Sequence, residues 1–487
     1  MTTPTLVGTR HEGLLIGGER IAATADATFE NISPVTGASF ATMAAATPAD
    51  AIRAVEAAQR AFADWADRSF VERRAVLLRA ADILESEYEA VRELLALETG
   101  AVAPWAAMNV HESAATLREA AGLASSPVGE LLPSANPATL NLSLRRPAGV
   151  VLAIVPWNAP IILSARSTAI ALALGNTVVL RPSEESPISS GHLLASALER
   201  AGAPAGVVNV VTTAPGGGRG AINAMIEHPA VSRVVFIGST QVGRSIAAVA
   251  GSALTPVVME LGGKNSTIVR HDADLDRWVP RLAFAAFANA GQVCMCSERI
   301  VAHSSIADEL TDRLAAFADG MLVGDPRDAS TELGPVINAR AAAAFGEFIE
   351  DAKANGATVR AGGTIEGSLA RPTVLTGVTR ACRFYGEESF LPIVSITSVQ
   401  DDEEALERAN EGGYGLIGGV ASADEGTAER IATRMHAGAV HVNGPSIGDE
   451  PHVPFGGVGA SGFGRLGGGD SVRFFTQQQT LYRHPAR

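Results

Sequence analysis

Two of the three cysteines of the chain stand two residues apart, in the stretch GQVCMCSERI at positions 291–300. A cysteine attacks as its thiolate, so a catalytic cysteine is expected near a helix start or a proton acceptor. Cys294 follows a glycine that can end the preceding helix. The alternative is that Cys294 and Cys296 are small buried hydrophobic residues. A metal site is not expected, because no second cysteine pair supplies the remaining ligands.

Two glycine-containing segments could approach a nucleotide. FIGSTQVG, at positions 236–243, is expected to start a helix, so Gly238, Ser239 and the first backbone N–H groups could face a pyrophosphate. GGGRGA, at positions 216–221, formally fits the pattern G-x-G-x-x-A after the strand-like run VVNVV.

The elements that must position these residues follow from alternating apolar runs. From Val150 to about Met259, strand-like runs such as VVLAIV, TVVLRP and RVVFIG alternate with helix-like segments. This pattern predicts repeated βαβ units and a mostly parallel sheet covered on both faces, with ligands beyond the carboxyl ends of its strands. A second α/β block extends from about Leu261 to Arg465, so we expect the site in a cleft between the two.

The remaining segments divide into helices and isolated strands. The first thirty residues look like a short strand arm and a loop, and helical periodicity covers Pro48 to Leu123, with one helix expected from Ser69 to a stop at Gly100. TLNLSLRRP, at 139–147, alternates leucines as a strand with one covered face does. With the extended C-terminal run VRFFTQQQTLYR it could form a small sheet between subunits, or each could be an ordinary edge strand.

Composition limits the classes of partner. At 487 residues, two or three domains are expected. Acidic residues outnumber basic ones, 52 to 38, and no basic stripe occurs, so nucleic acid is not an expected partner. The N-terminal stretch lacks the layout of a signal peptide, three cysteines cannot form a disulfide framework, and prolines and Arg166 interrupt the apolar run at 148–180. We therefore expect a cytoplasmic protein with no membrane contact.

Seven short motifs occur in one order along the chain. They are PWNAP (156–160), GNTVVLRPSEESP (175–187), FIGSTQVG (236–243), MELGGKN (259–265), GQVC (291–294), EESFLP (387–392) and PFGGVGASGFGR (454–465). Together they make nearly the whole chain resemble the aldehyde dehydrogenase superfamily. WAAMNVHESAATLREAAGLA, PWNAPIILSARSTA and HVNGPSIGDEPHVPFGG resemble more closely the aromatic aldehyde dehydrogenases, of the salicylaldehyde, benzaldehyde and vanillin type.

The resemblance implies an α/β protein with two Rossmann-like parallel-sheet domains and a small β oligomerisation element. A cofactor-binding domain is expected over residues 1–125 and 148–259, and a catalytic domain over 260–468. Residues 126–147 and 469–487 are expected to supply strands that join a homodimer or homotetramer.

The resemblance also implies the chemistry, which is NAD(P)-dependent oxidation of an aldehyde, expected to be aromatic, to its carboxylic acid. Cys294 would attack the carbonyl carbon, and the Asn158 amide with the Cys294 N–H would donate to the resulting oxyanion. Glu260 would act as general base for hydrolysis of the thioester, with partial burial raising its pKa. The alternatives are that Asn158 caps the turn at Pro156 and that Glu260 caps a surface helix.

The expected cofactor is NAD. Arg181 and Glu184 would hold the adenosine ribose with Ser183 nearby, and a carboxylate there favours NAD, although Arg181 stands where lysine is usual and could accommodate NADP. Glu388 would hold the nicotinamide ribose and Phe390 would pack on its ring, while Leu391 replaces a glycine common in the family. The pyrophosphate would bind GSTQVG rather than GGGRGA. The further cofactor-binding residues implied are Trp157, Gly238, Ser239, Val242, Gly243 and Leu261.

Three residues are candidates for aldehyde binding. Ala159 stands where many family members have an aromatic residue, which opens space, and Arg166 lies about two helical turns beyond Asn158. Arg166 could hold a ring hydroxyl, a phenolate or a carboxylate, and Trp105 could stack on an aryl ring. Alternatively, Trp105 fills a seam between helices and Arg166 pairs with a structural carboxylate. Cys296 is assigned to packing or occasional oxidative pairing.

Two other functions are compatible with the fold. In a coenzyme A-acylating enzyme, the thiol of coenzyme A would take the acyl group in place of water. Transfer to a thiol does not require Glu260 as a base, so the presence of Glu260 favours water. An inactive structural or binding protein would not need Asn158, Glu260 and Cys294 together.

Overall fold

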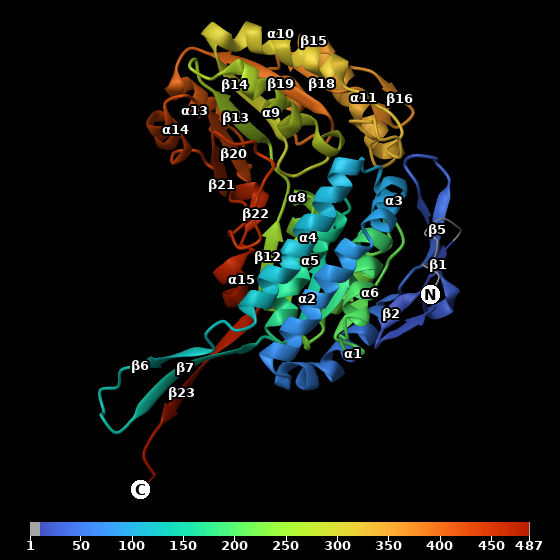
Figure 1. Ribbon diagram of the computed structural model, residues 1–487, viewed down its shortest axis with the longest axis vertical. Helices are drawn as coiled ribbons and strands as arrows, with labels where there is room; N and C mark the ends of the chain where they lie inside the picture. The colour runs from blue at the N-terminus through green and yellow to red at the C-terminus, as the bar shows by residue number, and fades with distance from the viewer. Residues whose placement is uncertain (1–9, 487) are drawn as a thin grey trace.

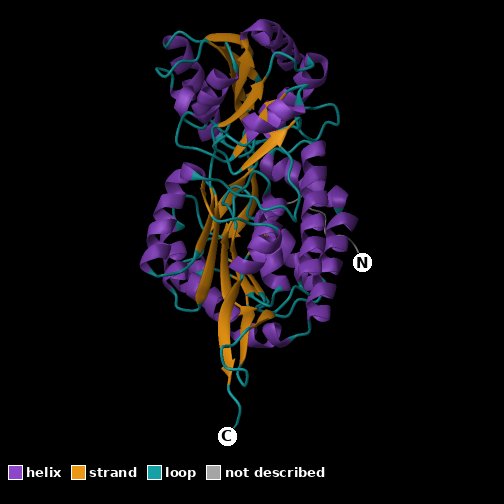
Figure 2. Cartoon of the chain, turned by 90° about the vertical axis from the view of Figure 1, so that its left-hand side faces the viewer, coloured by secondary structure: helices purple, strands orange, loops and turns teal. Residues whose placement is uncertain are grey.

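The computed structural model describes residues 10–486 and consists of two lobes and a projecting arm (Figure 1). Each lobe contains one large β-sheet flanked by helices (Figure 2). These two sheets confirm the predicted α/β architecture. Residues 1–9, part of the expected N-terminal strand arm, lie outside the described residues.

The lower lobe of Figure 1 is built on an eight-stranded sheet. In spatial order its strands are β22 (Gly462–Phe463), β12 (Val257–Glu260), β11 (Val231–Ile237), β8 (Val150–Ile154), β9 (Thr177–Arg181), β10 (Val208–Val210), β2 (Leu14–Ile16) and β3 (Glu19–Ile21). The strands from β12 to β10 are parallel, as the alternating pattern predicts. The edge strands β2, β3 and β22 are antiparallel to their neighbours. Since β22 comes from the 260–468 segment, that segment contributes to both lobes.

Helices cover both faces of this sheet. They are α1 (Pro48–Asp67), α2 (Phe70–Ser86), α3 (Tyr88–Thr99), α4 (Ala103–Leu123), α5 (Pro160–Ala173), the π-helical turn η2 (Ile188–His192), α6 (Leu193–Arg200), α7 (Arg219–Glu227) and α8 (Thr240–Ser252). Side chains of α2, α4, α5 and α6 share one core, and those of α7, α8 and part of α1 share another. A smaller sheet of β1 (Arg10–Glu12), β5 (Ser39–Ala44) and β4 (Thr28–Ile32) lies beside them.

The prediction of a single helix from Ser69 to Gly100 is wrong. The chain leaves helical geometry at Glu87 (φ −104°, ψ 18°), so two helices are present. The bend lets α2 pack on α4 and α6 while α3 packs on α4 and η2. One straight helix could not follow both surfaces. Gly100 does end the second helix, in the left-handed region at φ +74°, which glycine adopts without strain.

The upper lobe contains a seven-stranded sheet. Its strands, in spatial order, are β15 (Thr358–Ala361), β18 (Thr373–Thr376), β19 (Ile393–Val399), β14 (Ser297–His303), β13 (Asn265–Val269), β20 (Ile417–Ala421) and β21 (Ala439–Val442). All neighbours are parallel except β15 and β18. The helices are α9 (Leu275–Phe287), α10 (Ser304–Gly320), α11 (Ala339–Ala354), α12 (Arg383–Gly386), α13 (Asp402–Asn410) and α14 (Glu425–Ala432), with a hairpin of β16 (Ile365–Glu366) and β17 (Leu369–Ala370).

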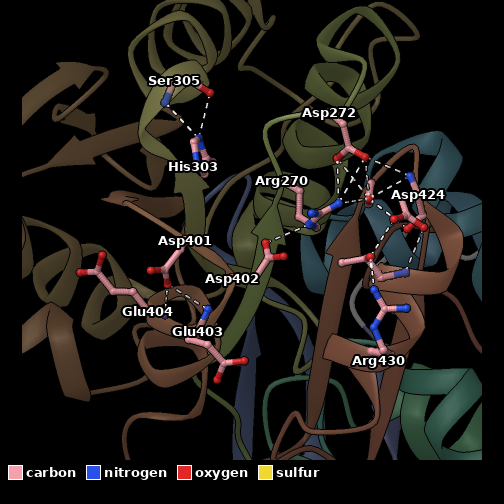
Figure 3. A network of polar contacts seen from close by, with 12 residues as sticks. Arg270, Asp272, His303, Ser305, Asp401, Asp402, Glu403, Glu404, Asp424 and Arg430 are labelled. Atoms are coloured by element: carbon pink, nitrogen blue, oxygen red, sulfur yellow. Dashed lines mark hydrogen bonds and ion pairs between the residues drawn. The ribbon is translucent and has the colours of Figure 1, made fainter.

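A polar network fixes the carboxyl ends of this second sheet (Figure 3). Arg270, directly after β13, donates to Asp402 at 2.9 Å and to the Ser422 hydroxyl at 2.8 Å. Asp401 and Asp424 accept from the first backbone N–H groups of α13 and α14, which caps both helices. Cys294 precedes β14, so this network lies at the opposite end of the strands from Cys294. It therefore serves the fold.

The arm is a three-stranded antiparallel sheet of β23 (Thr476–Arg483), β7 (Leu140–Pro147) and β6 (Gly129–Leu132). The strand expected from the alternating leucines is present as β7, but the C-terminal segment is extended only from Thr476. The residues before it form α15 (Gly468–Phe474), which packs on α4 and α5 and ends at the fully buried Phe475. The face that carries Leu142 is uncovered in the single chain, since Leu131 and Leu481, paired with it across the sheet, are 67% and 46% exposed.

Within residues 10–486, no helix combines the length and apolar character that a bilayer crossing requires.

Candidate active site

Two cavities meet at the Cys294 side chain, between the two lobes. The larger, of about 250 Å³, lies beyond the carboxyl ends of β8, β11 and β12. The smaller, of about 100 Å³, is bounded by α4, α5 and the loop after β21. Four residues line both cavities: Asn158, Leu163, Cys294 and Phe455. The predicted nucleophile therefore has access to one space on each side.

The loop that carries Cys294 is held by hydrogen bonds from both neighbouring segments. Asn265, the first residue of β13, donates through Nδ2 to the carbonyl oxygens of Cys294 (2.7 Å) and Cys296 (2.8 Å). Gln292 accepts from the backbone N–H of Ile337 at 2.8 Å. These bonds fix the loop on which the thiol lies.

Gly291 is required by the close approach of another loop. Its φ is +71°, and a Cβ there would come within 2.1 Å of the Leu391 carbonyl oxygen. Leu391, the departure from the family pattern, is itself buried in the core of the upper lobe.

Glu260 ends β12 and is 3% exposed. Burial raises the pKa of its carboxyl to about 8, which Arg166 and Arg465 oppose and Asp449 reinforces. Within the described part of the chain, its Oε1 atom is buried with no hydrogen-bonding partner. A buried carboxyl with a free oxygen facing a cavity is suited to exchange protons near neutral pH. The alternative of a surface helix cap is wrong, because Glu260 is buried at a strand end.

Asn158 follows β8 and is 4% exposed. Its backbone carbonyl oxygen accepts from Trp105 Nε1 (2.9 Å) and from Asn289 Nδ2 (3.1 Å), and these two hydrogen bonds hold the turn in place. Asn158, like Cys294, lines both cavities. An amide held there can donate to an oxygen bonded to the carbon that the sulfur attacks.

Acidic side chains line the cavity next to the resting thiol. Burial raises the pKa of Cys294 to about 12, with Glu260, Glu388 and Asp449 adding to the effect and Arg166 opposing it. The sequence predicted a nearby proton acceptor, and Glu260 and Cys294 indeed line the same cavity. At neutral pH the free thiol is therefore protonated.

Six of the predicted cofactor residues line the larger cavity: Trp157, Gly238, Ser239, Leu261, Glu388 and Phe390. Ser239 is the N-cap of α8, as expected, and accepts from the Val242 N–H. The other five residues do not line it. Val242 and Gly243 form the first turn of α8, and Arg181, Ser183 and Glu184 lie at the end of β9 and in the following turn.

The turn that presents Glu388 and Phe390 depends on a residue that the sequence analysis missed. Glu298 is buried in β14, forms an ion pair with buried Lys264, and accepts from the backbone N–H groups of Ser389 and Phe390, both at 2.9 Å. Phe390 is thereby held at φ +56° with its ring edge-on to Trp157, 5.7 Å between centroids. The signal was a glutamate just before the apolar residues Ile300, Val301 and Ala302, which indicate a buried strand, because a carboxylate is buried only with partners.

The predicted aldehyde-binding residues Trp105, Ala159 and Arg166 all line the smaller cavity. Trp105 is also structural, since it donates to the Asn158 carbonyl. Arg166 forms an ion pair with Asp449, and its guanidinium lies 5.0 Å from the centroid of the Phe455 ring. The structure thus shows the pairing with a carboxylate that was the alternative for Arg166, and the same side chain lines the cavity. Asp449 was not anticipated.

The chain matches the model of the "Aldehyde dehydrogenase family" over residues 21–481. It belongs to the aldehyde dehydrogenase family. The resemblance stated from the motifs is confirmed, and the protein is an aldehyde dehydrogenase.

Among its relatives are enzymes named for aromatic aldehydes. A vanillin dehydrogenase of Pseudomonas fluorescens is 44% identical over 464 residues, which cover 95% of this chain and 96% of the relative. A benzaldehyde dehydrogenase [NAD(+)] of Pseudomonas putida is 41% identical, covering 89% of this chain and 88% of the relative. The crystal structure of a salicylaldehyde dehydrogenase from Pseudomonas putida G7, complexed with salicylaldehyde, has a TM-score of 0.95 and 37% identity and covers 98% of this chain and 99% of that chain.

Two further sequence features of this aldehyde dehydrogenase have structural explanations. Cys296 is 3% exposed in the core of the lower lobe, consistent with packing. Of the triple glycine, Gly218 precedes α7, and a Cβ on it would lie 2.6 Å from the Thr213 hydroxyl and 3.1 Å from Arg181 Nη2. The absence of a side chain at Gly218 therefore leaves room for Thr213 and Arg181.

Proposed function

We propose that this aldehyde dehydrogenase oxidises aromatic aldehydes to carboxylic acids with NAD, using Cys294 as nucleophile. The observation that carries the proposal is the location of Cys294 where the two cavities meet, with Asn158 beside it in both and Glu260 beside it in the larger. The aldehyde would enter through the smaller cavity and the nicotinamide through the larger. The relatives named for vanillin, benzaldehyde and salicylaldehyde support the aromatic substrate class.

The first step joins the Cys294 sulfur to the carbonyl carbon. The S–H bond breaks and its proton passes to water, while the carbonyl oxygen becomes an oxyanion. The Asn158 amide and the Cys294 backbone N–H would donate to this oxygen, and each such donor typically lowers the barrier by roughly 3 to 4 kcal/mol.

The residues of the larger cavity fit a nicotinamide dinucleotide. A cavity beyond the carboxyl ends of parallel strands, next to the N-terminus of α8, suits a pyrophosphate, and Glu388 can accept from a ribose hydroxyl. When bound, NAD supplies the acceptor for the hydride that leaves the substrate carbon. Trp157 and Phe390 would hold the nicotinamide against that carbon. A thioester on Cys294 remains, and Glu260 in its ionised form would take a proton from the water that cleaves it.

The proposal assigns a role to each part of the chain. Residues 1–125 and 148–259 would bind the cofactor, residues 260–468 would supply the nucleophile, and the segments 126–147 and 469–487 would join subunits. We also propose a cytoplasmic location, because Cys294, Cys296 and Cys382 are free thiols and a reducing compartment preserves them.

The aldehyde specificity is tested by steady-state kinetics with NAD on benzaldehyde, salicylaldehyde, vanillin and hexanal. The kcat/KM for the aryl aldehydes is expected to exceed that for hexanal by about tenfold or more, because the aromatic rings of Trp105 and Phe455 in the wall of the smaller cavity favour an aryl ring. An equal or higher kcat/KM for hexanal would contradict the aromatic substrate class.

NAD is expected to be preferred over NADP by about tenfold or more in kcat/KM. Arg181 Nη2 donates to Glu184 (2.9 Å) and to the Thr213 hydroxyl (2.7 Å), so its charge is already compensated, and Glu184 would repel a 2′-phosphate. The Glu184→Gln variant should lower the preference by about tenfold, measured as the ratio of the two kcat/KM values. Glu199→Gln, which removes a carboxylate on α6, is the control. An unchanged ratio in Glu184→Gln would rule out this role.

The arm is proposed to pair with a second copy of the chain in a homodimer or homotetramer. Leu131, Leu142 and Leu481 align across β6, β7 and β23 and expose an apolar face with no cover in the single chain. Leu131→Asp combined with Leu481→Asp should shift the sedimentation coefficient to that of a monomer. Leu322→Asp, at a leucine that is 56% exposed in the upper lobe, should leave the assembly intact. A double variant that still sediments as the unmodified protein does would argue that the subunits join elsewhere.

A further inference from the structure

The smaller cavity carries three charged side chains on otherwise mostly apolar walls. Glu112 comes from α4, Arg166 from α5, and Asp449 from the loop after β21. Cys294 opens into the same space, so the ring of a bound aldehyde must lie among these groups. Their charges therefore act directly on ring substituents.

The positive charge of Arg166 is already paired with a carboxylate, so it would bind a substrate anion only weakly. Arg166 is 8% exposed, its Nη2 atom is in an ion pair with Asp449 Oδ2, and one face of its guanidinium lies over the Phe455 ring at 5.0 Å. This pairing disfavours two of the three ring substituents that the sequence left open for Arg166. A carboxylate or phenolate would compete with Asp449 for a cation that is already paired.

The surroundings of the ring disfavour a further anion. Two acidic side chains, Glu112 and Asp449, and one guanidinium, that of Arg166, line the cavity. Burial raises the pKa of Glu112, and Asp449 and Glu450 add to the effect against His111 and Arg166, so this place already favours the neutral form of a carboxyl group over its charged form. A further anion brought by the substrate would be buried next to these groups, and like charges so placed cost substantial free energy.

A neutral hydroxyl on the ring, in contrast, could form a hydrogen bond with Asp449. Asp449 Oδ2 pairs with Arg166, and within residues 10–486 its Oδ1 accepts no hydrogen bond. Asp449 lines the smaller cavity and its side chain is 20% exposed, so this oxygen can accept from a neutral phenolic O–H.

We propose that Asp449 is a specificity-determining residue that selects aromatic aldehydes with a neutral or hydroxyl-bearing ring and rejects those whose ring carries an anionic substituent. This inference rests on the proposed function and deepens it, because it states which aryl aldehydes the same site accepts. Asp449 acts twice, by neutralising Arg166 and by presenting its own carboxylate. Selection by repulsion of the wrong substrate is a common route to specificity.

The test compares two substrates of nearly equal shape, 4-formylbenzamide and 4-formylbenzoate, with benzaldehyde as reference and NAD saturating. The unmodified enzyme should show a kcat/KM for the amide at least about tenfold above that for the carboxylate, a difference of about 1.4 kcal/mol. In Asp449→Asn, which keeps the shape and frees the charge of Arg166, this ratio should fall to within about threefold of unity. Comparing ratios within each variant removes any general loss of activity.

Glu450→Gln is the matched control, because Glu450 is the next residue, its side chain is 72% exposed, and it does not line the smaller cavity. It should keep the ratio of the unmodified enzyme. The measurement on the unmodified enzyme decides the proposal even if Asp449→Asn fails to fold. Equal use of the amide and the carboxylate by the unmodified enzyme, or an unchanged ratio in folded Asp449→Asn, would overturn the role of Asp449. Oxidation of hexanal in preference to all three aryl aldehydes would overturn the proposed function as well.

Discussion

Replacing Cys294 by alanine should reduce the kcat/KM for aldehyde oxidation by about 10⁴-fold or more. Of the four residues that line both cavities, Asn158, Leu163, Cys294 and Phe455, only Cys294 carries a nucleophile. Without the sulfur no thiohemiacetal forms, so the substrate carbon has no tetrahedral state from which a hydride can leave. NADH absorbance with benzaldehyde or vanillin measures the loss.

The neighbouring cysteine gives a matched control. Cys296 is 3% exposed in the core and separated from Cys294 by one residue, so Cys296→Ala removes an equivalent thiol from the same loop. It should keep its activity within about threefold of the unmodified enzyme. Iodoacetamide should inactivate the unmodified enzyme by alkylating Cys294, and aldehyde and NAD together should change that rate. Activity that survives in Cys294→Ala and fails in Cys296→Ala would show that the wrong thiol was assigned. A thiol that ligands neither protect nor activate would favour an inert homologue.

Patterns that are local in sequence predicted the architecture well. Alternating apolar runs indicated the parallel strands β8 to β12, because a strand buried on both faces must be apolar throughout. Alternating leucines indicated β7. The bend at Glu87 and the helix α15 before Thr476 were missed, since both depend on packing against α4 rather than on local propensity.

The candidate site was predictable where one motif carries the chemistry. Cys294, Glu260 and Asn158 were found in this way, and they line one cavity in the structure. The residues that hold the side chains of the site in place were not predicted. Asn265 supports the Cys294 loop across the sheet, and Asp449 reaches Arg166 across 283 positions of sequence. Contacts between residues so far apart leave no periodic signal in a single sequence.

Replacing Glu260 by glutamine should separate the two halves of the reaction. Oxidation can still proceed to the thioester, so a burst of about one NADH per site is expected, but steady-state turnover should fall by about 10²- to 10⁴-fold, because no base activates water. Rapid-mixing absorbance at saturating NAD and aldehyde measures both phases. Hydroxylamine, which attacks a thioester without that base, should restore turnover. A variant without a burst and without rescue would assign Glu260 to thiol activation instead.

The pH dependence gives the same carboxyl an independent signature. The pKa of Glu260 is about 8 in the folded enzyme, above its ordinary value of 4.5. Steady-state hydrolysis should therefore rise from pH 6 and level off above about 8, as the base ionises, and Glu260→Gln should lose this rise. In the folded state the group holds a proton that the unfolded chain releases. Its contribution to the free energy of unfolding is thus fully present below pH 4.5 and is lost as pH rises through about 8.

This linkage separates a catalytic loss from unfolding. Glutamine cannot ionise, so at pH 8.5 the Glu260→Gln variant should unfold at a temperature no lower than that of the unmodified enzyme. At the same pH its activity relative to the unmodified enzyme should be lowest. Calorimetry and the NADH assay on the same samples make the comparison. If the variant lost stability in parallel with activity, or if turnover of the unmodified enzyme were flat from pH 6 to 9, Glu260 would be a structural residue. In that case water could not be the acceptor it activates, and transfer of the acyl group to a thiol would become the better account of the site.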